Sequence, residues 1–463
     1  MQDATLNQAN SSTISERSTR RYRTSGVEGS ELTPRTTRSV RHGDAEILGE
    51  EHDETEVPRE ARLLCDAQGK LIFIGDCAPL SFFQTVRQLV TSKVDQNAFA
   101  PQTSRYSVLE NASSGSQLGD LRSAPDVAIE TVQAAVPAYL AATAGLVDLF
   151  EDNARLLQDL TTWVSQGHVG SDNIAAAVNY LVVAIGCQRT NEDAALRYFE
   201  FARDQALANL SGNLSVATVQ AFTLVTLYML RACQINGAFL FFGIAVRTAY
   251  SIGIHRTEVN TRFGHVIHKQ RDRLWISLRI VDLFLSTSMG RPPATSDVDC
   301  TVPYRTMNAD GEEDFDILNA SAQIFLIIEG IVLEVYSRKK ISPQLTEGIS
   351  RELREFSIRW LQQLKDIVAA PEAALNLPEA HGACQVISSY YYAVMLVSRP
   401  FLMYEMHRRL SPESHGTSIF KAGVVSGKSK LADACIDAAS LMTDLILDLI
   451  ERSIISERLP VLV

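Results

Sequence analysis

Residues 215–256 read SVATVQAFTLVTLYMLRACQINGAFLFFGIAVRTAYSIGIHR and contain two apolar runs of helical length. A short break around Asn236-Gly237 separates the runs, and the second run ends at Ile252-Gly253-Ile254-His255-Arg256. Neither run shows the strict alternation of apolar and polar residues that is typical of a half-buried strand. The stretch therefore predicts two buried helices that pack closely.

The next segment predicts a third buried helix with a stiff end. Residues 271–304 read RDRLWISLRIVDLFLSTSMGRPPATSDVDCTVPY. One apolar stripe at helical spacing consists of Trp275, Leu278, Val281 and Leu285. The cluster Gly290-Arg291-Pro292-Pro293 ends the helix, because proline lacks a backbone N–H and clashes with the preceding turn. Packing of three helices accounts for these residues without any chemistry.

Helical patterns fill the remaining chain from Pro137 onward. They lie near 137–150, 153–167, 171–188, 192–209, 215–234, 237–253, 268–289, 316–338, 345–368, 379–408 and 430–452. Glycines and the proline cluster mark their ends. No run of short alternating strands occurs in this region. The predicted class is therefore all-α, with one multi-helix domain over residues 126–463.

Residues 61–125 are predicted to hold a β-hairpin-like segment, one helix and a linker. Two apolar runs in RLLCDAQGKLIFI (62–74) flank a turn that contains glycine. An amphipathic helix is expected over 80–94. Its apolar stripe consists of Phe83, Val86, Val90 and Val94. Residues 95–125 return to Ser, Gly, Asn and Gln and are expected to form a linker.

Residues 1–60 are predicted to be a disordered tail, because they hold too few large apolar side chains to offset the entropy of ordering. Residues 1–42 carry seven arginines against four acids, and residues 43–60 carry eight acids against Arg59. The weak candidates for DNA contact in the basic part are Arg17, Arg20, Arg21 and Arg23. Such a tail suits localisation or docking, and a plain solvated linker is an equal alternative.

The composition is that of a folded, acidic protein. Of the 463 residues 46% are hydrophobic, and the net charge is -11. An acidic body gains little by neutralising phosphates, which argues against nucleic-acid binding by the body. The seven cysteines include no close pair, so free thiols are expected rather than a zinc site or a disulfide framework. We expect no signal peptide and no membrane contact, and the least polar window, 205–230, predicts a buried helix.

Three short motifs suggest chemistry, and each has a plainer interpretation. Ala422–Ser429 fits a relaxed phosphate loop, but the preceding stretch predicts a loop instead of the strand that such a site needs. The acids of DGEEDFD (310–316) could hold a divalent metal, yet no second set of ligands accompanies them, which favours solvated charge. His255, His265 and His268 are expected to be surface or capping histidines.

An ordered series of motifs resembles a known family. The matching pieces are Val219-Gln220-Ala221, Ala245-Val246-Arg247, Ile252-Gly253-Ile254-His255-Arg256, Arg273-Leu274-Trp275, Asp282, Gly290-Arg291-Pro292-Pro293, Ser296-Asp297-Val298-Asp299, Val302-Pro303 and Leu396-Val397-Ser398-Arg399-Pro400-Phe401-Leu402. Together with the extended segment 69–76, their order resembles the middle homology region of fungal zinc-cluster transcription factors, the fungal-specific transcription factor domain. The motif residues expected to be structural are His255, Arg256, Trp275, Asp282, Gly290, Arg291, Pro292 and Asp297.

The resemblance implies a nuclear, pathway-specific regulator of transcription, for example of a metabolic or secondary-metabolite gene cluster. In that family a domain in which six cysteines hold two zinc ions reads the DNA. The first cysteine here is Cys65, so no zinc ligand is carried over and no cofactor is expected. Three explanations stay open: action through a partner, an upstream exon that encodes the cluster, or weak binding by the arginine-rich arm.

The partners expected from the resemblance are another protein, in a homo- or heterodimer, and a small-molecule effector. DNA is a partner only through one of the three routes above. A helical scaffold or corepressor without DNA binding is the first alternative function. We expect no enzyme activity; an all-α metal-dependent enzyme using Asp314 or Asp316 is the least favoured alternative.

Overall fold

The computed structural model describes residues 55–65, 70–98, 124–167, 173–307, 311, 313–370, 376–410 and 427–455. All of these belong to one unit that the contacts trace from His52 to Val463. The arginine candidates of the tail, Arg17, Arg20, Arg21 and Arg23, lie outside the described residues. So do the linker at 99–123 and most of the turn between the two hairpin strands. The domain boundaries expected at residues 60 and 125 stay predictions.

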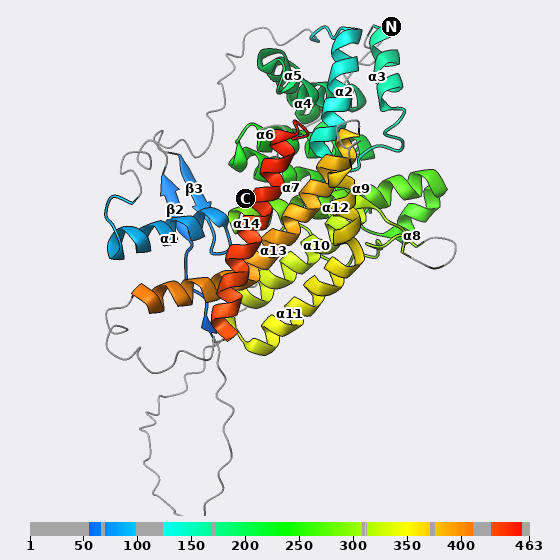
Figure 1. The fold of residues 1–463 in the computed structure, drawn as a ribbon. Helices are drawn as coiled ribbons and strands as arrows, with labels where there is room; N and C mark the ends of the chain where they lie inside the picture. The colour runs from blue at the N-terminus through cyan, green and yellow to red at the C-terminus, as the bar shows by residue number, and fades with distance from the viewer. Residues whose placement is uncertain are drawn as a thin grey trace, which may run out of the picture. The chain divides into compact units, whose positions relative to one another are not determined.

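Helices dominate the described residues, which confirms the predicted all-α class (Figure 1). They are α1 (Pro79–Lys93), α2 (Ile129–Thr143), α3 (Leu156–Ser165), α4 (Ile174–Cys187), α5 (Glu192–Ala208), α6 (Val216–Arg231), α7 (Ile235–Ser251), α8 (Thr257–Asn260), α9 (His265–Met289), α10 (Ile317–Ile331), α11 (Pro343–Phe356), α12 (Gln362–Ala369), α13 (Leu377–Leu410) and α14 (Gly427–Glu451). The π-helical turns Val332–Tyr336 and Ser357–Leu361 continue α10 and α11. The short helix α8 is absent from the sequence-based expectations.

Local capping explains where several helices begin. The side chains of Asn173, Asn191, Ser215, Asp316 and Ser342 each accept a hydrogen bond from a backbone N–H in the first turn of the following helix. A cap of this kind stabilises a helix by about 1 kcal/mol. These residues set the starts of α4, α5, α6, α10 and α11 close to the predicted positions.

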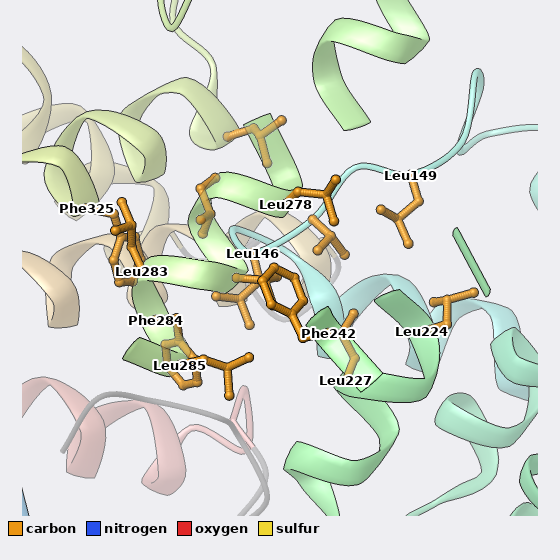
Figure 2. Packing of buried hydrophobic residues seen from close by; sticks show 14 of the residues in the cluster. Leu146, Leu149, Leu224, Leu227, Phe242, Leu278, Leu283, Phe284, Leu285 and Phe325 are labelled. Atoms are coloured by element: carbon orange, nitrogen blue, oxygen red, sulfur yellow. The ribbon is translucent and has the colours of Figure 1, made fainter. Parts of the chain in front are cut away.

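The centre of the core is α9. Its residues from Leu274 to Leu285 are buried on every side, including the predicted stripe of Trp275, Leu278, Val281 and Leu285. Figure 2 shows why: side chains of α9 lie between Phe325 of α10 on one side and Leu227 of α6 and Phe242 of α7 on the other. The predicted three-helix packing is therefore confirmed, with α10 as a further neighbour.

The start of α2 was predicted wrongly. Pro137 was expected to begin the helix, but α2 begins at Ile129 and continues through the proline. Its buried side packs on α4, where a Cβ atom at Gly186 would lie 2.1 Å from the carbonyl oxygen of Ala135. Gly186 therefore allows the backbones of α2 and α4 to lie in close contact.

Another interior proline, Pro400, is accommodated by a tertiary hydrogen bond. Proline at this position leaves the carbonyl of Leu396, one turn earlier, without its helical donor. The hydroxyl of Tyr336 donates to that carbonyl over 2.9 Å. As a result α13 runs unbroken from Leu377 to Leu410, alongside α14.

The predicted hairpin is present as strands β2 (Arg62–Cys65) and β3 (Leu71–Ile74), paired antiparallel. Ile72 and Ile74 face inward, while Leu63 and Phe73 are exposed. The predicted stripe of α1 is wrong, because Phe83 is 52% exposed. The helix packs instead through Phe82, whose ring lies 4.6 Å from the guanidinium carbon of Arg399.

Residues 55–60, predicted as the end of a disordered tail, are ordered against the helical body. Strand β1 (Thr55–Glu56) pairs antiparallel with β4 (Lys340–Ile341), and the N–H of Val57 donates to the carbonyl of Lys339 over 3.0 Å. A two-residue strand that pairs with a distant segment leaves no periodic pattern in the sequence. We call residues 55–60 the N-terminal strap.

In the described part of the chain, one helical stretch, Ile317–Tyr336, is long and apolar enough to cross a membrane, with a mean hydropathy of 1.6. It comprises α10 and the π-helical turn after it, and 56% of its apolar window is buried inside the fold. Its composition follows from its place in the core, beside α9 and α13. The window at 205–230 contains the buried helix α6, as predicted.

Candidate functional site

The motif residues singled out in the sequence gather around α9 and the loop that follows it. Trp275 and Asp282 lie on α9, His255 and Arg256 follow α7, and the others belong to residues 290–304. The N–H of Thr301 donates to the carbonyl of His255 over 3.1 Å, which joins the two loops. We call residues 290–304 the α9 loop.

Asp282 holds the start of the α9 loop. Its carboxylate accepts hydrogen bonds from the N–H of Ala294 at 3.0 Å and the N–H of Thr295 at 2.6 Å, and from the Thr295 hydroxyl at 2.5 Å. Burial raises the pKa of Asp282, against the opposing effect of these donors. A carboxylate among apolar residues of a core helix thus replaces the missing backbone partners of a proline-rich loop.

Arg279 is the charged centre of the site, and sequence reasoning did not select it. Its guanidinium donates to Asp297 at 3.0 and 2.9 Å, to Thr295 at 2.9 Å and to Glu329 at 2.6 Å. Burial opposes its charge, but the carboxylates of Asp297 and Glu329 raise its pKa above the usual value. An arginine inside an otherwise apolar helical run was the available signal.

An aromatic cluster lies under the same loop. The rings of Tyr250 and His255 are 4.8 Å apart, and the ring of Trp275 lies 5.3 Å from Tyr250. The hydroxyl of Tyr250 accepts a hydrogen bond from the N–H of Ser296 over 3.0 Å. His255 is buried, so the surface interpretation of this histidine is wrong. Its ring fills space between two aromatic side chains, a contact that spacing alone does not reveal.

Arg256 ties the end of α7 to the far end of the α9 loop. It donates to Asp299 over 2.6 Å and to Glu258 over 3.1 Å. His255 Nε2 also lies 3.4 Å from the Asp299 carboxylate. These ion pairs are open to solvent, so each contributes little to stability. Their effect is to fix the direction of the loop.

Gly290 ends α9 in close contact with the N-terminal hairpin. Its φ is 64°, in the left-handed region, and the N–H of Gly75 donates to the carbonyl of Met289 over 2.8 Å. Arg291 donates to the carbonyl of Phe73 at 3.2 Å and to the side-chain oxygen of Asn236 at 2.6 Å. Pro292 itself is exposed.

Gly75→Ala is expected to lower the free energy of unfolding by about 1–3 kcal/mol. A Cβ atom at this position would lie 1.9 Å from the carbonyl oxygen of Gly290, so two backbones must move apart. Urea unfolding measures the change. Gly348→Ala is the matched control, because it meets open space inside α11 and should stabilise by about 0.5–1 kcal/mol. Equal effects at both positions would contradict the contact.

A second polar cluster lies where the N-terminal strap meets α13. Arg399 is buried and donates to the carbonyl of Cys77 over 3.0 Å. Asp76 accepts from the N–H groups of Glu60 at 2.6 Å and Ala61 at 2.7 Å, and it pairs with Lys339. Although burial opposes ionisation, these donors hold the pKa of Asp76 below its usual range. Burial raises the pKa of Glu60 to about 7.

The raised pKa of Glu60 makes stability depend on pH. Because the folded state binds the proton more tightly than the unfolded chain, the contribution of Glu60 is greatest below its ordinary pKa of 4.5 and is lost as the pH rises through about 7. The free energy of unfolding of Glu60→Gln should therefore rise, relative to that of the unchanged protein, by about 2–3 kcal/mol as the pH goes from acidic to mildly alkaline. Urea unfolding at both ends of that window tests it. Glu56→Gln, an exposed neighbour on β1, is the control and should show no such gain.

The other candidate motifs have structural roles where they are described. Glu313 pairs with Arg359 over 3.1 Å, and Asp316 caps α10 and pairs with Arg273. The solvated-charge interpretation is therefore wrong for these two acids, because both side chains are largely buried. His268 contacts Thr257 and Asp272, and His265 is exposed. Gly427-Lys428-Ser429 forms the first turn of α14, and the residues before it lie outside the described part.

Among the described residues no group of three or more His, Cys, Asp or Glu side chains could hold a metal ion. The six-cysteine zinc cluster that the resemblance implies therefore does not fit this part of the chain. Among the motif side chains, Asp282 and Asp297 hold the α9 loop by polar contacts, and Trp275 packs beneath it. Their arrangement supports a structural role for the motif residues around the core helix.

Residues 150–366 match the fungal specific transcription factor domain. The chain contains a domain of this family. The matched range includes all the motif residues expected to be structural, from His255 to Asp297. The match therefore falls on the part of the fold where those residues meet. No solved structure matches the chain.

Relatives of the domain are regulators of transcription in fungi. Activator of stress genes 1 of Saccharomyces cerevisiae is 24% identical over 241 residues, covering 48% of this chain and 24% of the relative. Filamentous growth regulator 27 of Candida albicans is 28% identical over 180 residues, covering 36% and 23%. Oosporein cluster regulator OpS3 of Beauveria bassiana is 31% identical over 102 residues, covering 22% and 14%. The chain spans about a quarter of the length of the first two relatives.

Proposed function

We propose that this chain is a nuclear regulator of transcription that controls a defined set of genes, such as a metabolic or secondary-metabolite gene cluster. The main support is the match of residues 150–366 to the fungal specific transcription factor domain. The name of the relative OpS3, an oosporein cluster regulator, supports control of a gene cluster. The described motif residues serve architecture, which supports a role without catalysis.

In this proposal the helical body does not read DNA itself. The net charge of the chain is -11, and such a body is repelled by phosphates. Sequence-specific contact would come from a zinc-cluster module or from a partner protein. The body would contact that partner, respond to a small molecule or restrain activation.

Deletion of the gene tests whether the chain controls a gene set, and fusion to a DNA-binding domain tests whether the chain acts on transcription. Transcripts of a restricted gene set should change on deletion and return when the chain is restored, and a fluorescent fusion should enter the nucleus. Fusion of the chain to an unrelated DNA-binding domain should change a reporter that carries the matching site. Unchanged transcripts, or a protein confined to the cytosol while its target genes are induced, would refute the proposal.

Co-purification from the native organism separates a DNA-targeted regulator from a scaffold or corepressor. A partner that carries a zinc cluster, together with chain-dependent occupancy of promoters, is expected for the regulator. The Arg279→Met variant should reduce both the amount of co-purified partner and the occupancy of promoters. Ile358→Ala, which changes a side chain that is 84% exposed, should reduce neither quantity. Promoters occupied equally with and without the chain would instead favour the corepressor.

A further inference from the structure

Helix α14 lies at the surface of the fold, and its main neighbour is α13 (Figure 1). One side of α14 is buried and holds Ala432, Cys435, Ala438, Met442 and Leu449. These positions recur every three, four or seven residues, as in one seam along a helix. The opposite side of α14 faces solvent, where a surface helix usually presents only polar residues.

An apolar stripe runs along this outer side. Ile436, Leu447 and Ile450 are 52%, 52% and 42% exposed. With Ser440 and Thr443 between them they follow at intervals of four, three, four and three residues, the spacing at which helices pair. The hydroxyls of Ser440 and Thr443 donate to carbonyls one turn earlier in α14, over 3.1 and 2.8 Å. Both hydroxyls are therefore satisfied within the helix. We call these five residues the outer seam.

A row of carboxylates borders the outer seam. It consists of Asp433, Asp437, Asp444, Asp448 and Glu451, all of them exposed. With 3.6 residues per turn, these positions fall within about 60° of one another, on one side of the seam. Asp448 pairs with Arg452 over 3.1 Å, and the other four have no cationic partner in the described part of the chain. No lysine or arginine occurs between residues 431 and 451.

This row of charge is unfavourable for the helix by itself. Asp433 stands four residues before Asp437, and Asp444 four before Asp448. Like charges at this spacing repel each other. Asp448 and Glu451 also lie near the C-terminal end of α14, where the helix dipole is negative. A cationic partner would relieve both effects, so the row of carboxylates favours a partner that carries positive charge.

A second copy of this chain does not suit the outer seam. Two α14 helices facing each other would bring together two rows of carboxylates, in a chain whose net charge is already -11. The complementary surface is a helix with apolar residues every three or four positions and lysines or arginines along one side. The outer seam covers 14 residues from Ile436 to Ile450, or about 21 Å, so the partner helix needs about four turns.

We propose that the outer seam of α14 docks a basic amphipathic helix of another protein. Ile436, Leu447 and Ile450 contact the apolar stripe of that helix, and the carboxylates beside them pair with its lysines or arginines. The contact leaves the buried side of α14 on α13, so docking does not require the core to open. The proposal goes beyond the proposed function, because binding is measured on the purified chain whatever genes it controls.

Fluorescence anisotropy with the purified full chain tests the proposal. The probe is a labelled peptide of about 20 residues with leucines at intervals of three and four, lysines along one side of them, and alanines elsewhere to favour a helix. The chain should bind it at least about tenfold more tightly than a peptide of the same composition whose leucines are shuffled off the stripe. Equal binding of the two peptides would overturn the proposal.

Two double variants separate the apolar from the charged contribution. Leu447→Gln, Ile450→Gln should weaken binding of the ordered peptide at least about tenfold, because apolar contact is lost. Asp437→Asn, Asp444→Asn should weaken it by about three- to tenfold, and this loss should shrink at high salt. All four positions are exposed, and far-ultraviolet circular dichroism shows whether the variants are folded.

The matched control is the double variant Glu347→Gln, Glu352→Gln, which removes the same charge from exposed positions on α11. It should bind the ordered peptide within about twofold of the unchanged chain, since distant charges are screened. Equal losses in the two charge variants would show attraction to the acidic body alone and would overturn the proposal. Sedimentation tests the second copy: a dimer that Leu447→Gln, Ile450→Gln converts to a monomer would also overturn it.

Discussion

Arg279→Met is expected to lower the free energy of unfolding by about 3–5 kcal/mol, as for other broken buried ion pairs. The guanidinium is 2% exposed and bonds to Asp297, Thr295 and Glu329. Methionine retains much of the apolar volume but leaves the carboxylates without their cation. The α9 loop should also loosen, since Thr295 and Asp297 lose their contact with α9. Urea unfolding and hydrogen exchange of the loop amides measure the two effects.

A double-mutant cycle isolates the ion pair from the loss of packing. Glu329→Gln in the Arg279→Met background should cost less than Glu329→Gln alone, because the carboxylate has already lost its partner. Arg351→Met is the control for the change of side chain, and at its exposed position it should alter stability by no more than about 0.5 kcal/mol. Additive effects of the two core substitutions would show that Arg279 and Glu329 do not stabilise each other.

Trp275→Ala is expected to lower the free energy of unfolding by about 3–5 kcal/mol, the usual range for a buried aromatic residue. The indole is 0% exposed and packs against Tyr250 and His255. Its removal opens a cavity between α9 and the end of α7, which the rigid surrounding helices can fill only in part. Thermal and urea unfolding give the change.

Trp275→Phe shows whether the apolar volume of Trp275 or its indole N–H matters, and Ile358→Ala is the exposed control. Its indole N–H has no hydrogen-bond partner among the described residues, so Trp275→Phe should cost much less than Trp275→Ala. Ile358→Ala, at an exposed position of α11's π-helical extension, should change stability by no more than about 0.5 kcal/mol. A neutral result for Trp275→Ala would show that the indole is not part of the core.

The site could be predicted in part. Trp275 stands in the predicted apolar stripe, Asp282 was selected through the family resemblance, and both lie on α9 beside the loop that follows it. Arg279, in the same helix, was not selected, although its side chain makes four hydrogen bonds, as many as that of Asp282. Its partners Asp297 and Glu329 come from a loop and from α10, and no local spacing relates residues that only the packing of helices brings together.

What the sequence by itself determined are the helices, their capped starts and the hairpin, because apolar periodicity, capping side chains and turn glycines act within a few residues of one another. The tertiary structure decided the rest. It packed α2 closely against α4 at Gly186, buried His255 between two rings, and paired the strap with β4. Such contacts join segments far apart in the chain, so their energy depends on the packed fold. The local spacing of residues in the sequence does not reveal them.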